Sequence, residues 1–391
     1  MKNIIYSLSV LSIILFGCKV EPIGQQPIDN IPPGTVSNIQ VKNIAGGALL
    51  TYIQPADEDL LYVKAVYSLK DGTMSEARSS LYKDTLKIVG FGDIQERQVK
   101  LIAVDRSRNE STEVITTINP LEPAVTTIGQ SISLVEDFGG VHGYWENPTK
   151  AEVSVVILKE DNNLEFVPLE TIYSSVANGE GVSRGMDTIP AKFGIYVQDR
   201  WENRSEIKYF TLTPLYETKF DRLKFKEVNL PNDQGGGGGG GWNNKASMWD
   251  DQFGDNGFSS PGGSGVWPHS VTIDLGVTAK ISRLRLFQRL GSYIFAEGNL
   301  RKFEIWGCQD LDPSGNWDSW TKLMDCTSIK PSGLPIGQNT SEDEYVAING
   351  EDFINSPTNP KVRFIRILVN RTWAGGDNFQ ISELHIFGDN R

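Results

Sequence analysis

Apolar and polar residues alternate with a period of two along much of the chain. Segments 61–69, 153–158 and 271–275 show the pattern, and so do 284–286 and 364–367. A period of two buries one face of an extended segment and leaves the other in solvent, which is typical of β-strands. No helical periodicity is needed to supply a core. The chain is therefore predicted to be all-β.

Two segments of the chain repeat each other. Residues 99–121 align without a gap to residues 193–215, at an offset of 94 positions. The identical positions include Asp105 with Asp199, Arg106 with Arg200, Asn109 with Asn203, Ser111 with Ser205, and Pro120 with Pro214. Each copy is predicted to be a strand, a polar turn and a second strand. Because Asx side chains bond their own backbone, we interpret these carboxylates as turn formers rather than as acid/base catalysts.

The repeated pattern resembles the closing hairpin of fibronectin type III and related immunoglobulin-like domains. A period near 94 residues suits one such sandwich per repeat. The resemblance implies two tandem β-sandwiches, at 35–121 and 122–215.

The first eighteen residues indicate export. Lys2 precedes an apolar run, 4–16, that is too short to span a bilayer. The run ends in Leu-Phe-Gly-Cys, which resembles a bacterial lipobox, so Cys18 is expected to be acylated; the alternative is an ordinary signal peptide with an incidental cysteine. The sequence thus predicts a signal peptide at 1–17 and a lipid-anchored spacer at 18–34. We expect an outer-membrane lipoprotein held by its lipid alone, exposed at the cell surface or facing the periplasm.

Charge and cysteine content narrow the function classes. The chain has 37 Lys and Arg against 49 Asp and Glu, a net charge of −12, which disfavours binding to nucleic acid. Three His and three Cys argue against zinc clusters. Once Cys18 is acylated, Cys308 and Cys326 are the remaining pair. In an oxidising compartment they either form a disulfide or stay as two buried thiols.

The segment 216–391 carries seven of the nine tryptophans and a series of ordered landmarks. They read Ala-Ser-Met-Trp-Asp-Asp from 246, Trp-Pro-His-Ser-Val-Thr-Ile-Asp-Leu-Gly from 267, Phe-Glu-Ile-Trp-Gly from 303, Trp-Thr-Lys-Leu from 320, Arg-Phe-Ile-Arg-Ile from 363, and Ile-Ser-Glu-Leu-His-Ile-Phe-Gly from 381. This order resembles the coagulation factor five/eight type C, or discoidin, family. The resemblance implies a galactose-binding-like β-sandwich jelly roll whose end loops bind sugars in bacterial members.

Many members of that family also hold a structural Ca²⁺. Asp250 and Glu383 occupy the matching positions, and the resemblance implies that they are its ligands. Asp251 stands where the family usually has glycine. This departure could alter the backbone that presents carbonyl oxygens to the ion.

Loop aromatics of this last domain are the candidates for sugar contact. A pyranose has apolar C–H faces and hydroxyl edges, so its site needs an aromatic ring with polar groups beside it. The Gly-rich loop 370–378 offers Trp373 with Arg371 and Asp377, and loop 288–295 offers Arg289 and Tyr293. We expect the two loops to converge. The competing interpretation is an ordinary solvated loop with a self-packed tryptophan.

No catalytic constellation is visible in the sequence. Nothing places paired carboxylates across a sugar, and none of the three histidines accompanies a nucleophile elbow. The chain resembles surface lipoproteins of bacterial polysaccharide-utilisation systems, which implies a non-catalytic glycan-binding protein serving a neighbouring transporter and glycan-degrading enzymes. The alternative is a surface adhesin or envelope-complex subunit that binds a protein partner.

Overall fold

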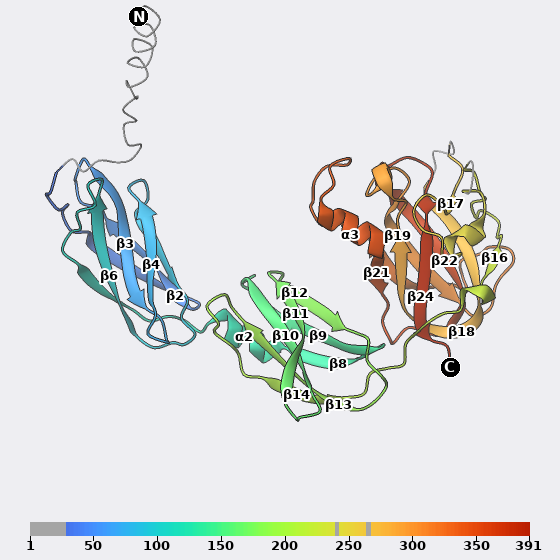
Figure 1. Ribbon diagram of the computed structural model, residues 1–391, viewed down its shortest axis with the longest axis horizontal. Coiled ribbons are helices and arrows are strands. Elements are labelled where there is room, and N and C mark those ends of the chain that lie inside the picture. The colour runs from blue at the N-terminus through green and yellow to red at the C-terminus, as the bar shows by residue number, and fades with distance from the viewer. Residues whose placement is uncertain (1–28, 239–241, 263–266) are drawn as a thin grey trace, which may run out of the picture.

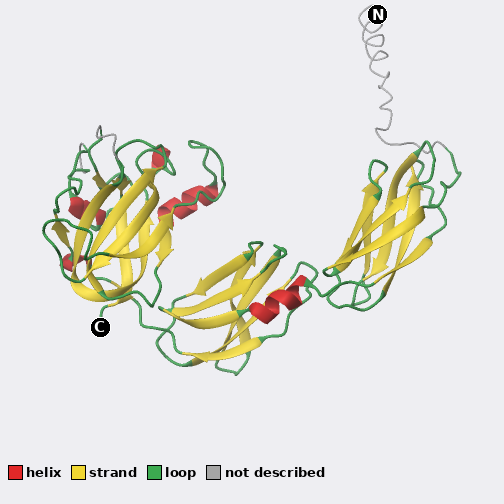
Figure 2. Ribbon diagram, turned by 180° about the vertical axis from the view of Figure 1, so that it is seen from behind, coloured by secondary structure: helices red, strands yellow, loops and turns green. Residues whose placement is uncertain are grey.

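The computed structural model describes residues 29–238, 242–262 and 267–391, which form three units in a bent row (Figures 1 and 2). Cys18 and the signal segment lie outside the described residues. Strands dominate each unit, so the prediction of an all-β chain is confirmed. Within the described ranges, no helix has the length and apolar character needed to cross a membrane.

The first unit is a sandwich of a three-stranded and a four-stranded sheet, in the orders β1-β2-β5 and β4-β3-β6-β7. The strands are β1 (Ser37–Ile44), β2 (Gly47–Ile53), β3 (Leu60–Ser68), β4 (Met74–Ser80), β5 (Thr85–Val89), β6 (Arg97–Asp105) and β7 (Val114–Ile118). Alternate residues of β3, including Val63 and Ala65, are fully buried between the sheets. The alternation seen in the sequence therefore marks the inner face.

The second unit repeats this arrangement, with sheets β12-β9-β8 and β11-β10-β13-β14. Its strands are β8 (Ser133–Asp137), β9 (Gly140–Glu146), β10 (Val153–Glu160), β11 (Phe166–Ser174), β12 (Asn178–Ser183), β13 (Ala191–Gln198) and β14 (Lys208–Leu212). A short helix, α2 (Ala124–Ser131), precedes them. Trp145 is 3% exposed and belongs to the core of this unit.

The two repeated turns are built from the same hydrogen bonds. The backbone N–H of Asn109 donates to Asp105 Oδ1 at 2.8 Å and its side-chain amide to Oδ2 at 2.9 Å. Asn203 and Asp199 repeat both bonds, at 3.0 and 2.9 Å. The two repeats therefore share the same side-chain hydrogen bonds as well as the same residues. The interpretation of these carboxylates as turn formers is confirmed.

The third unit is built around one long strand. β18 (His269–Phe287) pairs with β24 and β21 over one part and with β22 and β16 over another. The remaining strands are β15 (Thr218–Lys219), β16 (Lys226–Val228), β17 (Phe258–Ser259), β19 (Leu300–Cys308), β20 (Thr321–Thr327), β21 (Glu351–Ile354), β22 (Val362–Thr372), β23 (Gln380–Ile381) and β24 (Glu383–Asp389). A large buried cluster that includes Ile273, Phe303 and Ile367 fills the sandwich.

The third unit also contains helical turns that the strand pattern did not predict. They are α3 (Ser341–Asn349) and the 3-10 turns at Arg222–Lys224, Lys245–Met248 and Gly291–Tyr293. At the start of α3, Thr340 and Asp343 form a capping box, in which each side chain accepts from the other's backbone N–H. The sequence Thr-Ser-Glu-Asp at 340–343 was the available signal.

Both junctions between units are packed. At the first, the side-chain amide of Asn203 donates to the carbonyl oxygen of Gly90 at 3.2 Å. A Cβ on Gly92 would lie only 2.2 Å from Asn203 Oδ1, so the close approach requires glycine there. At the second, Glu217 joins Arg184 of the second unit, at 3.1 Å, to Arg283 of the third, at 3.2 Å.

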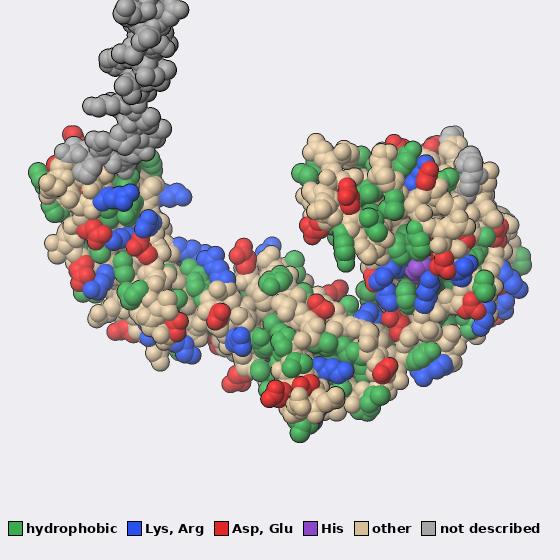
Figure 3. All heavy atoms as spheres, viewed as in Figure 1, with side chains coloured by type: hydrophobic (Ala, Val, Ile, Leu, Met, Phe, Trp, Pro, Cys, Tyr) green, Lys and Arg blue, Asp and Glu red, His purple; other side chains and the backbone are tan. Residues whose placement is uncertain are grey.

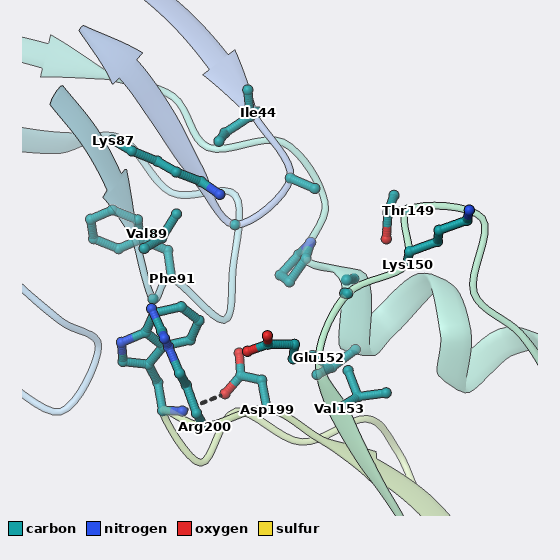
Figure 4. A pocket seen from close by; sticks show the side chains of 18 residues that line it. Ile44, Lys87, Val89, Phe91, Thr149, Lys150, Glu152, Val153, Asp199 and Arg200 are labelled. Carbon is teal, nitrogen blue, oxygen red and sulfur yellow. Dashed lines mark hydrogen bonds between the residues drawn. The ribbon is translucent and has the colours of Figure 1, made fainter. Parts of the chain in front are cut away.

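A cavity of about 460 Å³ lies at the first junction (Figure 4). Lys87 and Arg200 face it together with the carboxylates of Glu152 and Asp199, so its charges are mixed. The Trp201 ring there is covered by the Arg200 guanidinium, 4.2 Å from its centroid, and by Gly90. This cavity therefore has an indole already used in packing between the two sandwiches.

Candidate functional site

Trp373 follows the last residue of β22 and is fixed by three contacts. Its backbone N–H donates to the carbonyl of buried Asn299 at 2.9 Å. Its indole N–H donates to Ser328 Oγ at 3.2 Å, and the buried Phe295 ring packs edge-on against it with centroids 5.2 Å apart. The indole is half-buried, so part of the ring stays accessible in a defined orientation.

The accessible part of the indole lines an open cavity of about 390 Å³. Residues of the segment 327–336 also line this cavity, and Ile329, Leu334 and Ile336 are exposed there. Lys330 shapes this segment, because its amine donates to the carbonyl oxygens of Pro335 and Gln338 at 3.0 and 2.7 Å. The cavity thus combines a fixed aromatic ring with apolar and polar walls.

Arg301 and Lys302 lie on the strand side of the cavity. The Arg301 guanidinium lies over the indole, 4.6 Å from the ring centroid. Two register shifts in the pairing of β19 with β22 occur beside Lys302, which pairs with Arg371. Arg371, a candidate from the sequence, is exposed on β22 next to this wall. Sequence reasoning missed Arg301 and Lys302, although two consecutive cations interrupt the alternation before Phe303.

The other candidate loop comes close only through its backbone. The side-chain amide of Asn299 donates to the backbone carbonyls of Arg289 and Tyr293, at 3.2 and 2.7 Å, while the backbone carbonyl of Asn299 accepts from the Trp373 backbone N–H. The Arg289 guanidinium lies over the rings of Tyr293 and Trp242, at 3.7 and 4.8 Å, and pairs with Asp255 at 2.6 Å. Neither Arg289 nor Tyr293 lines the Trp373 cavity.

Asp377 lies at the other side of its loop. Its carbonyl oxygen is 2.9 Å from His269 Nε2, and its carboxylate approaches Gly262. It does not line the Trp373 cavity either. Of the five sugar-contact candidates from the sequence, Trp373 therefore lines the cavity, Arg371 lies beside it as the strand partner of Lys302, and the other three lie elsewhere.

The candidate metal ligands fall in a different place. Asp250 accepts hydrogen bonds from the Gln252 backbone at 2.9 Å and from the Asn256 amide at 3.1 Å. Glu383 is fully buried and accepts from the backbone N–H of Asp251 at 3.1 Å. Asp251, at the position where the family usually has glycine, has a left-handed backbone with φ 62°. Its carboxylate, not that of Asp250, lies with Glu383 and His385 in one cluster.

This cluster does not fit Ca²⁺. Calcium takes six to eight oxygen ligands, whereas one of the three side chains here offers a nitrogen. Two cations already neutralise Asp251, Lys219 at 3.1 Å and Arg222. Burial, with the nearby charges of Asp250 and Asp251, raises the pKa of Glu383 to about 8. Burial and the Lys219 charge lower the pKa of His385 to about 4. At neutral pH the two buried groups are mainly uncharged.

The raised pKa of Glu383 makes stability depend on pH. Its carboxyl prefers to be protonated when folded, so its contribution is full below the ordinary pKa of 4.5 and is lost as pH rises to about 8. Glu383→Gln keeps the neutral shape. We expect thermal melts to show that the free energy of unfolding of the variant, relative to that of the parent, rises between pH 5 and 9 by on the order of a few kcal/mol. A pH-independent difference in stability between Glu383→Gln and the parent would contradict this account.

Cys308 and Cys326 are both free and buried. Cys326 on β20 lies opposite Phe303 on β19. Phe303 is five residues from Cys308 along β19. At about 3.3 Å per residue this separation exceeds the roughly 7 Å that a disulfide spans between Cα atoms. Burial raises the pKa of Cys308 to about 11 and raises that of Cys326 further. The disulfide alternative is wrong, and the buried-thiol alternative describes the pair.

These features define a class of protein: tandem fibronectin-like sandwiches followed by a jelly-roll sandwich. The chain is 34% identical to a SusE-like protein of solved structure, covering 100% of that chain and 69% of this one, with a TM-score of 0.46. The identity over the whole of that relative, rather than the superposition, carries the assignment. This chain belongs to the SusE-like proteins.

Further comparisons concern separate parts of the chain. Three family models, each described as a domain of unknown function, match residues 33–120 (DUF4959), 121–223 (DUF5126) and 242–388 (DUF5000). The C-terminal domain of a Bacteroides fragilis chitobiase is 17% identical, with 44% of this chain and 97% of that chain covered and a TM-score of 0.32. An F5/8 type C domain from Bacteroides fragilis is 11% identical, with 45% and 98% covered and a TM-score of 0.29. No curated protein matches the chain.

Proposed function

We propose that this SusE-like protein is a non-catalytic, cell-surface glycan-binding lipoprotein that captures carbohydrate for a polysaccharide-utilisation system. One observation carries the proposal. A half-buried indole, that of Trp373, is held in a fixed orientation in an open cavity at a loop end of the C-terminal sandwich. An aromatic ring flanked by hydrogen-bonding groups is what a sugar ring requires.

The cavity supports weak, reversible binding. An indole that covers one sugar face removes about 60 Å² of apolar surface, worth about 1.5 kcal/mol. Each charge-assisted hydrogen bond adds about 1.5 to 3 kcal/mol before ordering costs. The sum corresponds to dissociation constants from about 1 mM to tens of micromolar, which suits a protein that must release its glycan to a transporter.

The lining of the cavity favours binding over hydrolysis. Glycosidases need two carboxyl groups across the scissile bond, about 5 to 9.5 Å apart. Among the described residues that line the Trp373 cavity, none is Asp or Glu. The proposed partners are therefore a glycan and, beside it at the membrane, a transporter or separate glycan-degrading enzymes.

The proposed location depends on Cys18. Acylation would hold an acidic chain at a membrane surface that repels it. We expect Cys18→Ala to move the protein from the detergent phase to the aqueous phase in a detergent-partition assay. A variant that is correctly processed and still membrane-associated would show that the lipid anchor is the wrong explanation.

A glycan array probed with the full chain in detergent tests the function. The expected result is binding to a restricted set of plant, host or microbial glycans. The alternative, an adhesin for a protein partner, draws support from exposed apolar side chains beside the cavity, on segment 327–336 and on α3, where Tyr345 and Ile348 are 67% and 58% exposed. A protein interface needs about 800 Å² per partner. Silence across the array would favour the adhesin and reject the proposed glycan function.

A further inference from the structure

The charged side chains that line the Trp373 cavity are all basic, while the carboxylate of Glu351 lies behind the wall and accepts hydrogen bonds from Ser328 and Ile329 at 2.7 and 3.1 Å. Arg301, Lys302 and Lys330 line the cavity, and no acidic side chain does so within the described part of the chain. Arg371 pairs with Lys302 across the neighbouring strands and adds a fourth cation beside the cavity. This is unusual in a protein whose net charge is −12. On the face seen in Figure 3, acidic and basic side chains are interspersed over all three units.

None of these four cations forms an ion pair with an acidic side chain among the described residues, and Arg301 and Lys302 are the two that line the cavity with their charged groups unoccupied. Neighbouring arginines of the same domain are neutralised: Arg283 by Glu217 at 3.2 Å, Arg285 by Asp352 at 2.7 Å and Arg289 by Asp255 at 2.6 Å. Lys330 differs from Arg301, because its amine is occupied by two backbone carbonyls and only its charge reaches the cavity.

Arg301 is also held in place. Its guanidinium lies 4.6 Å from the centroid of the Trp373 ring, and that ring is itself fixed by Phe295 and Ser328. A guanidinium stacked in this way loses little freedom when it binds an anion, and its planar donors match two oxygens of a carboxylate or sulfate. An unneutralised, oriented guanidinium next to an indole is suited to a sugar that carries an acidic group.

We propose that the Trp373 cavity selects anionic sugars, the uronate or sulfate residues of an acidic polysaccharide. This inference rests on the proposed glycan-binding function. Trp373 contacts the sugar ring, and Arg301 binds its acidic group. Lys302 and Arg371 attract the negative charge of the next sugar residue along the polysaccharide. The net negative charge of the chain opposes the approach of a polyanion only weakly, because at physiological salt charges farther apart than the Debye length of about 8 Å are largely screened.

The test is calorimetric titration of the full chain in detergent with two matched pairs of ligands. The first pair is oligogalacturonate and the same oligosaccharide after reduction of its carboxyl groups. The second pair is chondroitin sulfate oligosaccharide and its desulfated form. We expect neutralisation of the recognised group to weaken binding about tenfold to a hundredfold, as loss of a charge-assisted hydrogen bond does. The pair that responds identifies carboxylate or sulfate as the recognised anion.

Arg301→Met removes the charge while keeping a side chain over the indole. The variant should bind the acidic ligand more weakly by the same factor and bind the neutralised ligand with unchanged affinity. Arg204→Met is the matched control, because Arg204 also stacks on an aromatic ring, at 5.2 Å from Tyr196, but lies in the second sandwich. It lowers the net charge equally and should change neither affinity.

The outcomes separate this inference from the function on which it rests. Equal binding of acidic and neutralised ligands, or glycan-array binding confined to neutral glycans, would overturn anionic selection and leave glycan binding intact. Acidic binding that survives Arg301→Met unchanged would also overturn the assignment. Absence of binding to any glycan would reject the proposed function itself.

Discussion

Arg366→Met is expected to lower the free energy of unfolding of the C-terminal domain by about 3 to 5 kcal/mol, the cost of breaking a buried ion pair. The side chains of Arg366 and Asp233 are each 1% exposed and 2.9 Å apart. Arg366 also donates to the carbonyl of Gly315 at 3.0 Å and lies over the Trp317 ring at 4.2 Å. Without the guanidinium, Asp233 keeps a buried charge, with the Ser270 hydroxyl at 2.7 Å and the backbone N–H of Leu230 at 3.4 Å as its donor partners.

The same strand provides a matched control for this experiment. Arg363 of β22 pairs with Asp274 at 2.9 Å, but its side chain is 45% exposed. Chemical denaturation of Arg363→Met should therefore resemble that of the parent, since exposed pairs contribute little. Equal losses for the two variants would show that the buried pair has no special role in stability.

Trp373→Ala is expected to reduce glycan affinity below detection, because the indole provides the apolar surface and orients Arg301. Trp373 also packs on Phe295, so the variant should lose stability as well. We expect about 1 to 3 kcal/mol, less than the roughly 3 to 5 kcal/mol for a fully buried tryptophan. Calorimetry with a glycan from the array and thermal melts measure the two effects separately.

Tyr293→Ala is the control for that experiment. Tyr293 belongs to the neighbouring loop but stacks on Arg289 outside the cavity. It should leave affinity unchanged. Loss of affinity with Tyr293→Ala, or normal affinity with Trp373→Ala, would move the site to the Arg289 loop or away from this end of the domain.

The fold was largely predictable because its determinants are local. Period-two alternation marks the inner faces of strands such as β3 and β18. The repeated Asp-x-x-x-Asn turn revealed the duplication because Asp105 and Asp199 bond residues only four positions away. Helix α3 was missed because it contributes little to the core, so its hydrophobic pattern is weak. Its capping box at Thr340 and Asp343 is a stronger signal, but strand alternation does not reveal it.

The candidate site was only partly predictable, because it depends on long-range contacts. Trp373 was identified as a lone indole in a Gly-rich loop. Arg301 was missed, because it lies on a strand whose register shifts beside it, and pairing irregularities cannot be read from alternation. Arg289 was assigned to the sugar site from its loop, but the rings of Trp242 and Tyr293 and the carboxylate of Asp255 already engage its guanidinium.

The most direct measurement is a crystal structure of the full chain with an oligosaccharide identified on the glycan array. The account predicts a sugar ring in the cavity between Trp373 and segment 327–336, in contact with the indole and within hydrogen-bonding distance of Arg301. A sugar bound instead at the Arg289 loop, at the first junction or on either of the first two sandwiches would contradict it.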